Sequence, residues 1–141
     1  MTSPAQHVLF HDDSAKLAGV AAAWWRARIE APKFDAIGST QRDAPMHLAQ
    51  DLAAMNVRAA SGEQFIAFER ELTKVLLERR PLIVDVDYDP DDTLWAAAKE
   101  AEVDRSRFPW KTTMWMDWRA GRIRTRSGYG RPIEPLWPEV Q

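Results

Sequence analysis

The pattern that decides the fold lies in residues 82–88, which read Leu-Ile-Val-Asp-Val-Asp-Tyr. Every second residue from Leu82 onward is apolar, and this period of two is typical of a β-strand with one buried face. The alternation predicts that Val84 and Val86 lie in a core while Asp85 and Asp87 lie on the opposite face. A shift of one residue would exchange the two faces, so the register sets which side chains the sheet displays.

A β-hairpin is expected further along the chain. Residues 111–118 and 122–126 are the two predicted strands. The connecting Arg119-Ala120-Gly121 suits a three-residue loop in which glycine adopts the left-handed conformation. Gly128 and Gly130 end the second strand.

Four helices are predicted from N-cap residues and from the helical spacing of apolar residues. Their ranges are about 14–30, 43 to the break at 60–62, 61–79 and 93–103. The third helix begins with a capping-box pattern, Ser61 and Gln64. We expect its apolar side to pack against Trp24 or Leu52. That side carries Phe65, Phe68, Leu72 and Leu76.

The order of these elements predicts an α+β fold. In it, about four helices pack on one face of a small, three-stranded, mostly antiparallel sheet that ends in a β-hairpin. The 141 residues suit one compact domain, which we place at 1–131. The prolines after it predict that residues 132–141 form an extended, proline-rich C-terminal tail. We interpret the short apolar stretch at residues 7–10 as an edge strand.

The composition excludes several classes of protein. The chain has no cysteine, which rules out disulfides, thiolate metal sites and cysteine nucleophiles. It also lacks a glycine-rich phosphate-binding motif and the nucleophile motif of serine hydrolases. No apolar run is long enough to span a membrane. We therefore expect a cytoplasmic, non-enzymatic protein that uses no metal or other cofactor.

Charge is segregated along the chain, although the formal net charge is only −2. Residues 81–104 contain eight acidic residues and one lysine, whereas residues 105–131 contain eight basic residues and one aspartate. Such asymmetry says more about partners than the net charge does.

The acidic block provides a candidate acidic face. A second hypothesis uses three of its members, Asp85, Asp87 and Asp89, as ligands for a divalent cation in a metal-dependent enzyme. The whole acidic face comprises Asp85, Asp87, Asp89, Asp91 and Asp92.

Residues 89–95 read Asp-Pro-Asp-Asp-Thr-Leu-Trp. They resemble the first motif of the haloacid-dehalogenase phosphatase family, Asp-x-Asp-x-Thr. The resemblance implies a doubly wound domain with Asp89 as nucleophile and Asp91 as general acid. The alternative interpretation is that Asp91 or Asp92 caps the helix that follows.

Basic and aromatic residues interleave through the basic block. Arginine can hold phosphate, and aromatic rings can stack on bases or on guanidinium groups. Three arginines of the second hairpin strand fall on one face of that strand. The candidate binding residues are Arg105, Arg107, Trp115, Trp118, Arg119, Arg122, Arg124 and Arg126.

These features favour a small accessory protein that binds nucleic acid or a protein, not a membrane, through its hairpin face. The alternative is an inhibitor or adaptor, of the kind that phages and mobile elements encode, whose acidic block engages a basic, nucleic-acid-binding site on a partner. The arginines could also neutralise the acidic strand across the sheet. The sequence leaves these alternatives and the oligomeric state open.

Overall fold

A computed structural model describes residues 4–34 and 44–138, with the backbone alone at 4–12 and 44–47. The chain forms helices and strands in the order expected of an α+β fold, which confirms the predicted class. The elements are α1 (Pro4–Glu30), α2 (Ala44–Met55), α3 (Gly62–Arg79), β1 (Ile83–Val86), α4 (Asp92–Ala101), the short 3₁₀ helix η1 (Arg105–Arg107), β2 (Thr112–Asp117), β3 (Arg122–Ser127) and β4 (Glu134–Trp137).

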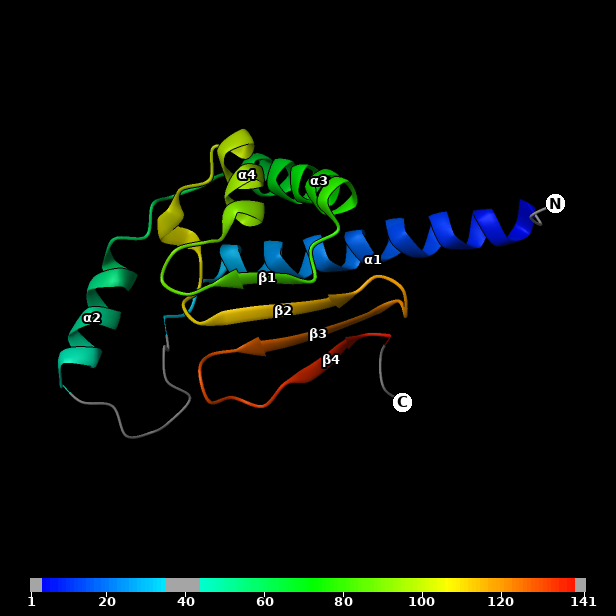
Figure 1. The fold of residues 1–141 in the computed structure, drawn as a ribbon. Helices are drawn as coiled ribbons and strands as arrows, with labels where there is room; N and C mark the ends of the chain where they lie inside the picture. The colour runs from blue at the N-terminus through cyan, green and yellow to red at the C-terminus, as the bar shows by residue number, and fades with distance from the viewer. Residues whose placement is uncertain (1–3, 35–43, 139–141) are drawn as a thin grey trace.

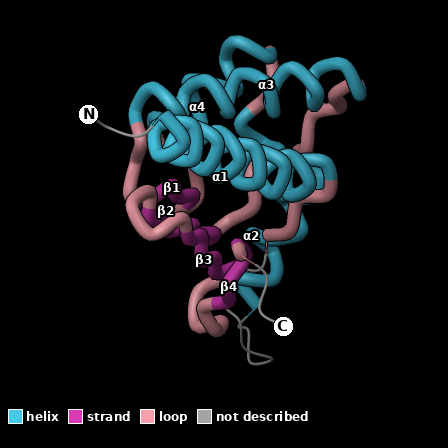
Figure 2. Tube along the Cα trace, turned by 90° about the vertical axis from the view of Figure 1, so that its right-hand side faces the viewer, coloured by secondary structure: helices cyan, strands magenta, loops and turns pink. Residues whose placement is uncertain are grey.

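The strands form one antiparallel sheet in the order β1-β2-β3-β4. Helices α1, α3 and α4 gather on one side of this sheet (Figure 2). α2 lies beyond the ends of the strands (Figure 1), and its apolar residues Leu48, Leu52 and Met55 are exposed. Three of the four helices therefore build the helix layer.

The core lies between the helix layer and the inner face of the sheet. Val84 and Val86 are fully buried, while Asp87 on the opposite face is exposed, which confirms the predicted register of β1. Because strand side chains alternate, the pairing register gives β2 and β3 the same division into a core face and an opposite face. The sheet residues of the core are Val84, Val86, Met114, Met116 and Ile123.

The predicted capping box of α3 is confirmed. The Ser61 hydroxyl accepts a hydrogen bond from the Gln64 amide (3.2 Å), and the Gln64 side chain accepts one from the Ser61 amide (2.8 Å). The helix then buries its predicted side against α1 and α4. Trp24 only covers the edge of this core, since Trp25 is the fully buried tryptophan of α1. Leu52 lies outside the core.

The hairpin is confirmed, and the sheet has one strand more than we predicted. β4 forms within the segment expected to be an extended tail, and it pairs with β3. Pro135 is accommodated because β4 is an edge strand, whose outer side needs no N–H donor. The strand expected at residues 7–10 was also wrong, since this stretch belongs to α1. A four-residue apolar run carries too little periodicity to separate a strand from a helix.

The antiparallel sheet also differs from the doubly wound domain that the resemblance of residues 89–95 implies. Consecutive strands of that domain would run parallel and be joined by helices. Here α4 joins β1 to β2, yet the two strands run antiparallel.

We predict that Leu72→Ala lowers the free energy of unfolding by roughly 2–5 kcal/mol, because it opens a cavity in the core. Leu72 is 0% exposed, whereas Leu52 is 48% exposed. Leu52→Ala is therefore the matched control, with an expected change within about 0.5 kcal/mol. Chemical denaturation measures both changes, and equal midpoints for the two variants would contradict this assignment of the core.

Candidate functional site

The sheet face opposite the helix layer is the open face. It consists of the strand residues that alternate with the core positions, and the pairing aligns them in rows across the sheet. One row contains Ile83, Trp115 and Arg124, and the next contains Asp85, Thr113 and Arg126. The open face comprises Ile83, Asp85, Thr113, Trp115, Asp117, Arg122, Arg124 and Arg126.

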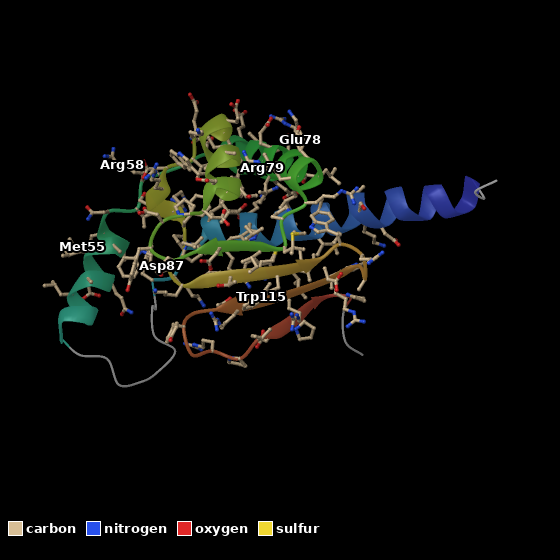
Figure 3. The ribbon with its side chains drawn as sticks, viewed as in Figure 1. Met55, Arg58, Glu78, Arg79, Asp87 and Trp115 are labelled. Carbon is tan, nitrogen blue, oxygen red and sulfur yellow. The ribbon has the colours of Figure 1, made fainter. Side chains whose placement is uncertain are left out.

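Cations and aromatic rings lie together on the β2–β3 half of this face (Figure 3 labels Trp115). The guanidinium carbons of Arg124 and Arg126 lie 6.0 and 5.5 Å from the centre of the Trp115 ring. Arg126 also lies 5.9 Å from the centre of the Tyr129 ring, which follows β3 and is exposed. These are distances at which a cation is attracted to the face of an aromatic ring.

The arginines of β3 are not paired with acids. Within residues 4–34 and 44–138, Arg122, Arg124 and Arg126 form no ion pair and no side-chain hydrogen bond. The Nε atom of Arg126 is buried without an acceptor in this part of the chain. Apart from this buried nitrogen, the guanidinium groups keep donors available for an external anion.

Strand order explains why these arginines and the acids of β1 do not pair. β2 lies between β1 and β3, so Asp85 and Arg126 occupy the same row two strands apart. With neighbouring strands about 4.8 Å apart, the two backbones are separated by roughly 10 Å. The Asp85 carboxylate instead accepts a hydrogen bond from the Thr113 hydroxyl at 2.5 Å. The direct neutralisation across the sheet that we considered is thus not formed.

The remaining acids serve different local purposes. Asp87 forms an ion pair with Lys111, and Asp89 is exposed. The described residues contain no group of three or more histidine, aspartate or glutamate side chains arranged to hold a metal ion. The three aspartates of the metal hypothesis therefore do not converge.

Asp91 caps α4, as the second interpretation of this motif predicted. Its carboxylate accepts hydrogen bonds from the Leu94 amide (3.0 Å) and from the Asp85 amide (2.8 Å). Burial raises the pKa of Asp91 above the usual aspartate value, and these two hydrogen bonds oppose the rise. Asp92 lies in the first turn of α4 and is exposed. One carboxylate thus holds α4 against the end of β1.

Two of the predicted binding residues lie in η1, against the helix layer. Arg107 donates hydrogen bonds to the carbonyl oxygens of Ile29, Arg58 and Glu30 at 2.8, 2.8 and 2.9 Å. Arg105 lies 4.3 Å from the centre of the Trp95 ring. Arg107 therefore ties three segments together, and the structure does not bring η1 to the open face.

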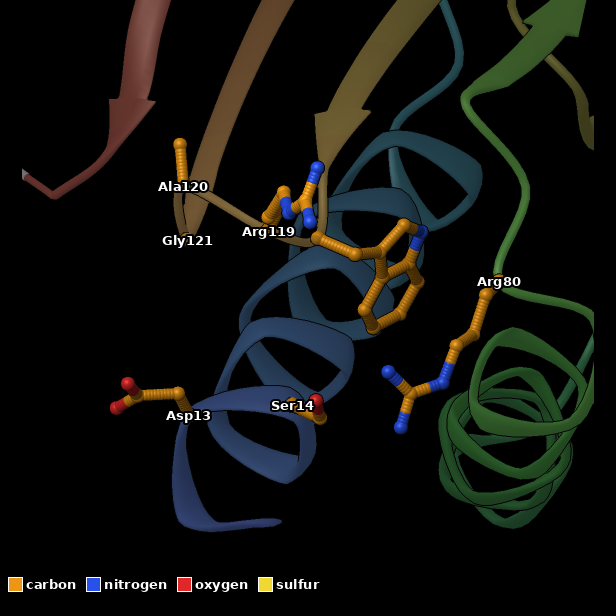
Figure 4. A pocket seen from close by; sticks show the side chains of 7 residues that line it. Asp13, Ser14, Arg80, Arg119, Ala120 and Gly121 are labelled. Atoms are coloured by element: carbon orange, nitrogen blue, oxygen red, sulfur yellow. The ribbon is translucent and has the colours of Figure 1, made fainter. Parts of the chain in front are cut away.

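Two other predicted binding residues, Trp118 and Arg119, line a cavity of about 540 Å³ at the hairpin end of the sheet (Figure 4). Trp118 donates a hydrogen bond from its ring nitrogen to the Pro81 carbonyl oxygen at 2.8 Å. Arg80 extends from the end of α3 beside this ring, and Arg119 lies on the other side of the cavity (Figure 4). Asp13 also lines the cavity, so the lining carries both acidic and basic side chains.

The structure adds Tyr88 to the site, a residue that our sequence analysis did not single out for binding. The Lys111 ammonium nitrogen lies 4.7 Å from the centre of the Tyr88 ring and 6.0 Å from the centre of the Tyr129 ring. Tyr88 and Tyr129 lie just after β1 and β3. Tyr88 closes the alternating pattern of residues 82–88, so its sequence signal indicated a strand residue rather than a binding residue.

Comparison with known protein families and with curated proteins found no match to this sequence. Among the described helices, none is both long enough and apolar enough to cross a membrane.

We predict that Asp91→Ala lowers the free energy of unfolding by about 1–3 kcal/mol, because it removes a helix cap and leaves a second amide without its acceptor. Asp92→Ala is the matched control, since it removes the same charge one residue away, with an expected change within about 0.5 kcal/mol. Thermal and chemical denaturation at neutral pH measure the difference. Equal stability of the two variants would show that Asp91 does not hold α4 to β1.

Proposed function

We propose that this protein is a non-enzymatic accessory factor that binds single-stranded nucleic acid across the β2–β3 half of the open face. One observation carries the proposal: the unpaired guanidinium groups of Arg124 and Arg126 lie beside the Trp115 and Tyr129 rings. In this arrangement the arginines contact phosphates while the two rings stack on bases. Because every base has an aromatic face, such binding depends little on sequence.

A single strand fits this surface better than a duplex. The aromatic rings can stack only on bases that are unpaired and turned toward the protein, whereas a duplex exposes mainly its phosphates and groove edges. The cations and rings follow the β2–β3 half of the sheet rather than a protruding helix that could enter a groove. Arg122, at the far end of the same strand face, extends the cationic track toward the hairpin loop.

The acids of β1 set the limit of this track. Asp85 of β1 lies on the open face and has no cationic partner among the described residues, so a phosphate backbone is repelled from that edge. Repulsion on one side and attraction on the other would guide the strand along β3. The net charge of −2 also means that affinity must come from this local surface rather than from the overall charge.

A second candidate is a protein partner that binds the acidic edge. β1 is an edge strand, and Leu82 and Ile83 are 71% and 52% exposed beside Asp85 and Asp87. Exposed apolar residues next to acids suit a partner with a basic, partly apolar surface, such as a nucleic-acid-binding site on another protein. In this alternative, Arg124 and Arg126 play no part in binding.

We predict that Arg124→Ala/Arg126→Ala weakens binding of a labelled single-stranded oligonucleotide and flattens its salt dependence. Loss of two phosphate contacts should reduce the slope of log K against log salt by roughly 1.4, because each contact on a single strand contributes about 0.7. Fluorescence anisotropy at several salt concentrations measures both effects.

The charge-matched control is Arg70→Ala/Arg79→Ala on the exposed side of α3 (Figure 3 labels Arg79). It removes the same charge from the helix layer and should leave the slope unchanged. Equal losses of oligonucleotide affinity in both variants would show that only the overall charge matters. Wild-type protein that binds no oligonucleotide at low salt would refute the proposal.

We also predict that Trp115→Ala weakens oligonucleotide binding by about 1–3 kcal/mol, the contribution of one stacked base, while Trp115→Phe retains most of the affinity. Phenylalanine keeps an aromatic face but removes the indole, so the pair separates stacking from other effects. Titrations of both variants, with melting curves as a check on folding, measure the difference. Similar affinities for the two variants would exclude stacking on Trp115.

A further inference from the structure

A second pocket lies at the end of the sheet away from the hairpin loop, between the end of α1, the start of β2 and the end of β3. Its volume is about 390 Å³, which is within the range of small-ligand pockets. Three of its lining residues are basic, and none of the described residues that line it is acidic. The lining residues that matter here are Arg28, Lys33, Trp110, Ser127 and Arg131.

Arg28 is the most constrained of the three cations. It is partly buried, and its guanidinium carbon lies 4.2 Å from the centre of the Trp24 ring. In the part of the chain that the structure describes, it forms no ion pair and no side-chain hydrogen bond. Burial lowers the pKa of Arg28, and Glu134 at a longer range opposes that effect. The pocket therefore holds a partly dehydrated cation whose hydrogen-bond donors are not used.

Lys33 and Arg131 approach the same pocket from two other segments. The Lys33 carbonyl oxygen accepts a hydrogen bond from the Trp110 amide at 3.2 Å, which fixes the chain after α1 against the start of β2. The Arg131 amide donates to the Gly128 carbonyl oxygen at 3.2 Å, which closes the turn after β3. Both side chains are exposed and have no acidic partner among the described residues.

We propose that this pocket binds a phosphate monoester. Three cations from separate segments more than balance the two negative charges of that group, and guanidinium groups bind phosphate oxygens in pairs. The exposed Ser127 adds a hydroxyl donor at the wall of the pocket. The Trp110 ring packs edge to face against Tyr88 and Phe34, with ring centres 5.0 and 5.5 Å away, and it supplies an apolar wall.

Two sources could supply such a group: a free nucleoside 5′-monophosphate, or the 5′-phosphate at the end of a nucleic-acid strand. The second source rests on the proposed function, because Ser127 and Gly128 of the pocket lie between Arg126 and Tyr129 in the chain. None of the pocket's lining residues belongs to the open face, so the two sites can be disabled separately.

The experiment compares the wild-type 141-residue chain with Lys33→Ala/Arg131→Ala and with the charge-matched control Arg79→Ala/Lys99→Ala. Both pairs remove one lysine and one arginine from exposed positions. Calorimetric titration with inorganic phosphate and with a nucleoside 5′-monophosphate should show binding to wild type. Phosphate affinity should fall by about tenfold or more in the pocket variant, since charge-assisted hydrogen bonds are lost, and it should stay unchanged in the control.

Oligonucleotides with a 5′-phosphate and with a 5′-hydroxyl distinguish the two sources. A preference for the 5′-phosphate that disappears only in the pocket variant identifies a strand end, whereas monophosphate binding without that preference identifies a free nucleotide. Absence of binding to every phosphate probe, or an equal loss in both double variants, would overturn the proposal. If Arg124→Ala/Arg126→Ala binds phosphate normally while wild type binds no oligonucleotide, only the proposed function fails.

Discussion

Burial of one face of the sheet against α1, α3 and α4 is the constraint on which the other features of this protein depend. Val84, Val86 and Met114 have no exposed surface, so β1 and β2 have one admissible register. Since strand side chains alternate, every residue between these core positions must face away from the helices. The exposure of Trp115 and Arg124 is therefore a consequence of packing on the other side of the sheet.

The order of the strands then determines how the segregated charge is used. Had β1 and β3 been neighbours, their aspartates and arginines would lie opposite one another as cross-strand pairs. β2 separates them, and Thr113 and Lys111 become the partners of Asp85 and Asp87. Surface ion pairs contribute little to stability in any case, so little is lost by keeping the arginines unpaired. The surface keeps an acidic side and a basic side.

The end of the sheet that contains Lys111 and Arg131 carries residues of both proposed sites. The turn after β3 places Tyr129 beside Arg126 and Lys111, and it places Arg131 at the pocket formed with α1. Gly128 and Gly130 have φ values of 109° and 79°, which only glycine adopts without strain, so this turn depends on both. A single turn therefore contributes residues to an extended surface and to a pocket of the same charge.

The sequence by itself determined the elements whose signals are local. The alternation at residues 82–88, the capping box at Ser61 and the cap at Asp91 each act within a few residues, so they can be predicted without knowledge of the rest of the chain. The hairpin belongs to the same group, because its turn needs a residue with a positive φ and Gly121 supplies one with a φ of 68°. The identity of the arginines on one strand face also followed from the period of two.

Only the tertiary structure decided which of these residues meet. β4 depends on pairing with β3, and its short proline-containing sequence has no period of its own. Arg28, Lys33 and Arg131 are far apart in sequence, and they line one pocket because α1 ends beside the start of β2. Arg107, which looked equivalent to the strand arginines, bonds to backbone carbonyls of the helix layer. Long-range contacts have no local signature, so the sequence could name the arginines but not separate structural ones from those free to bind.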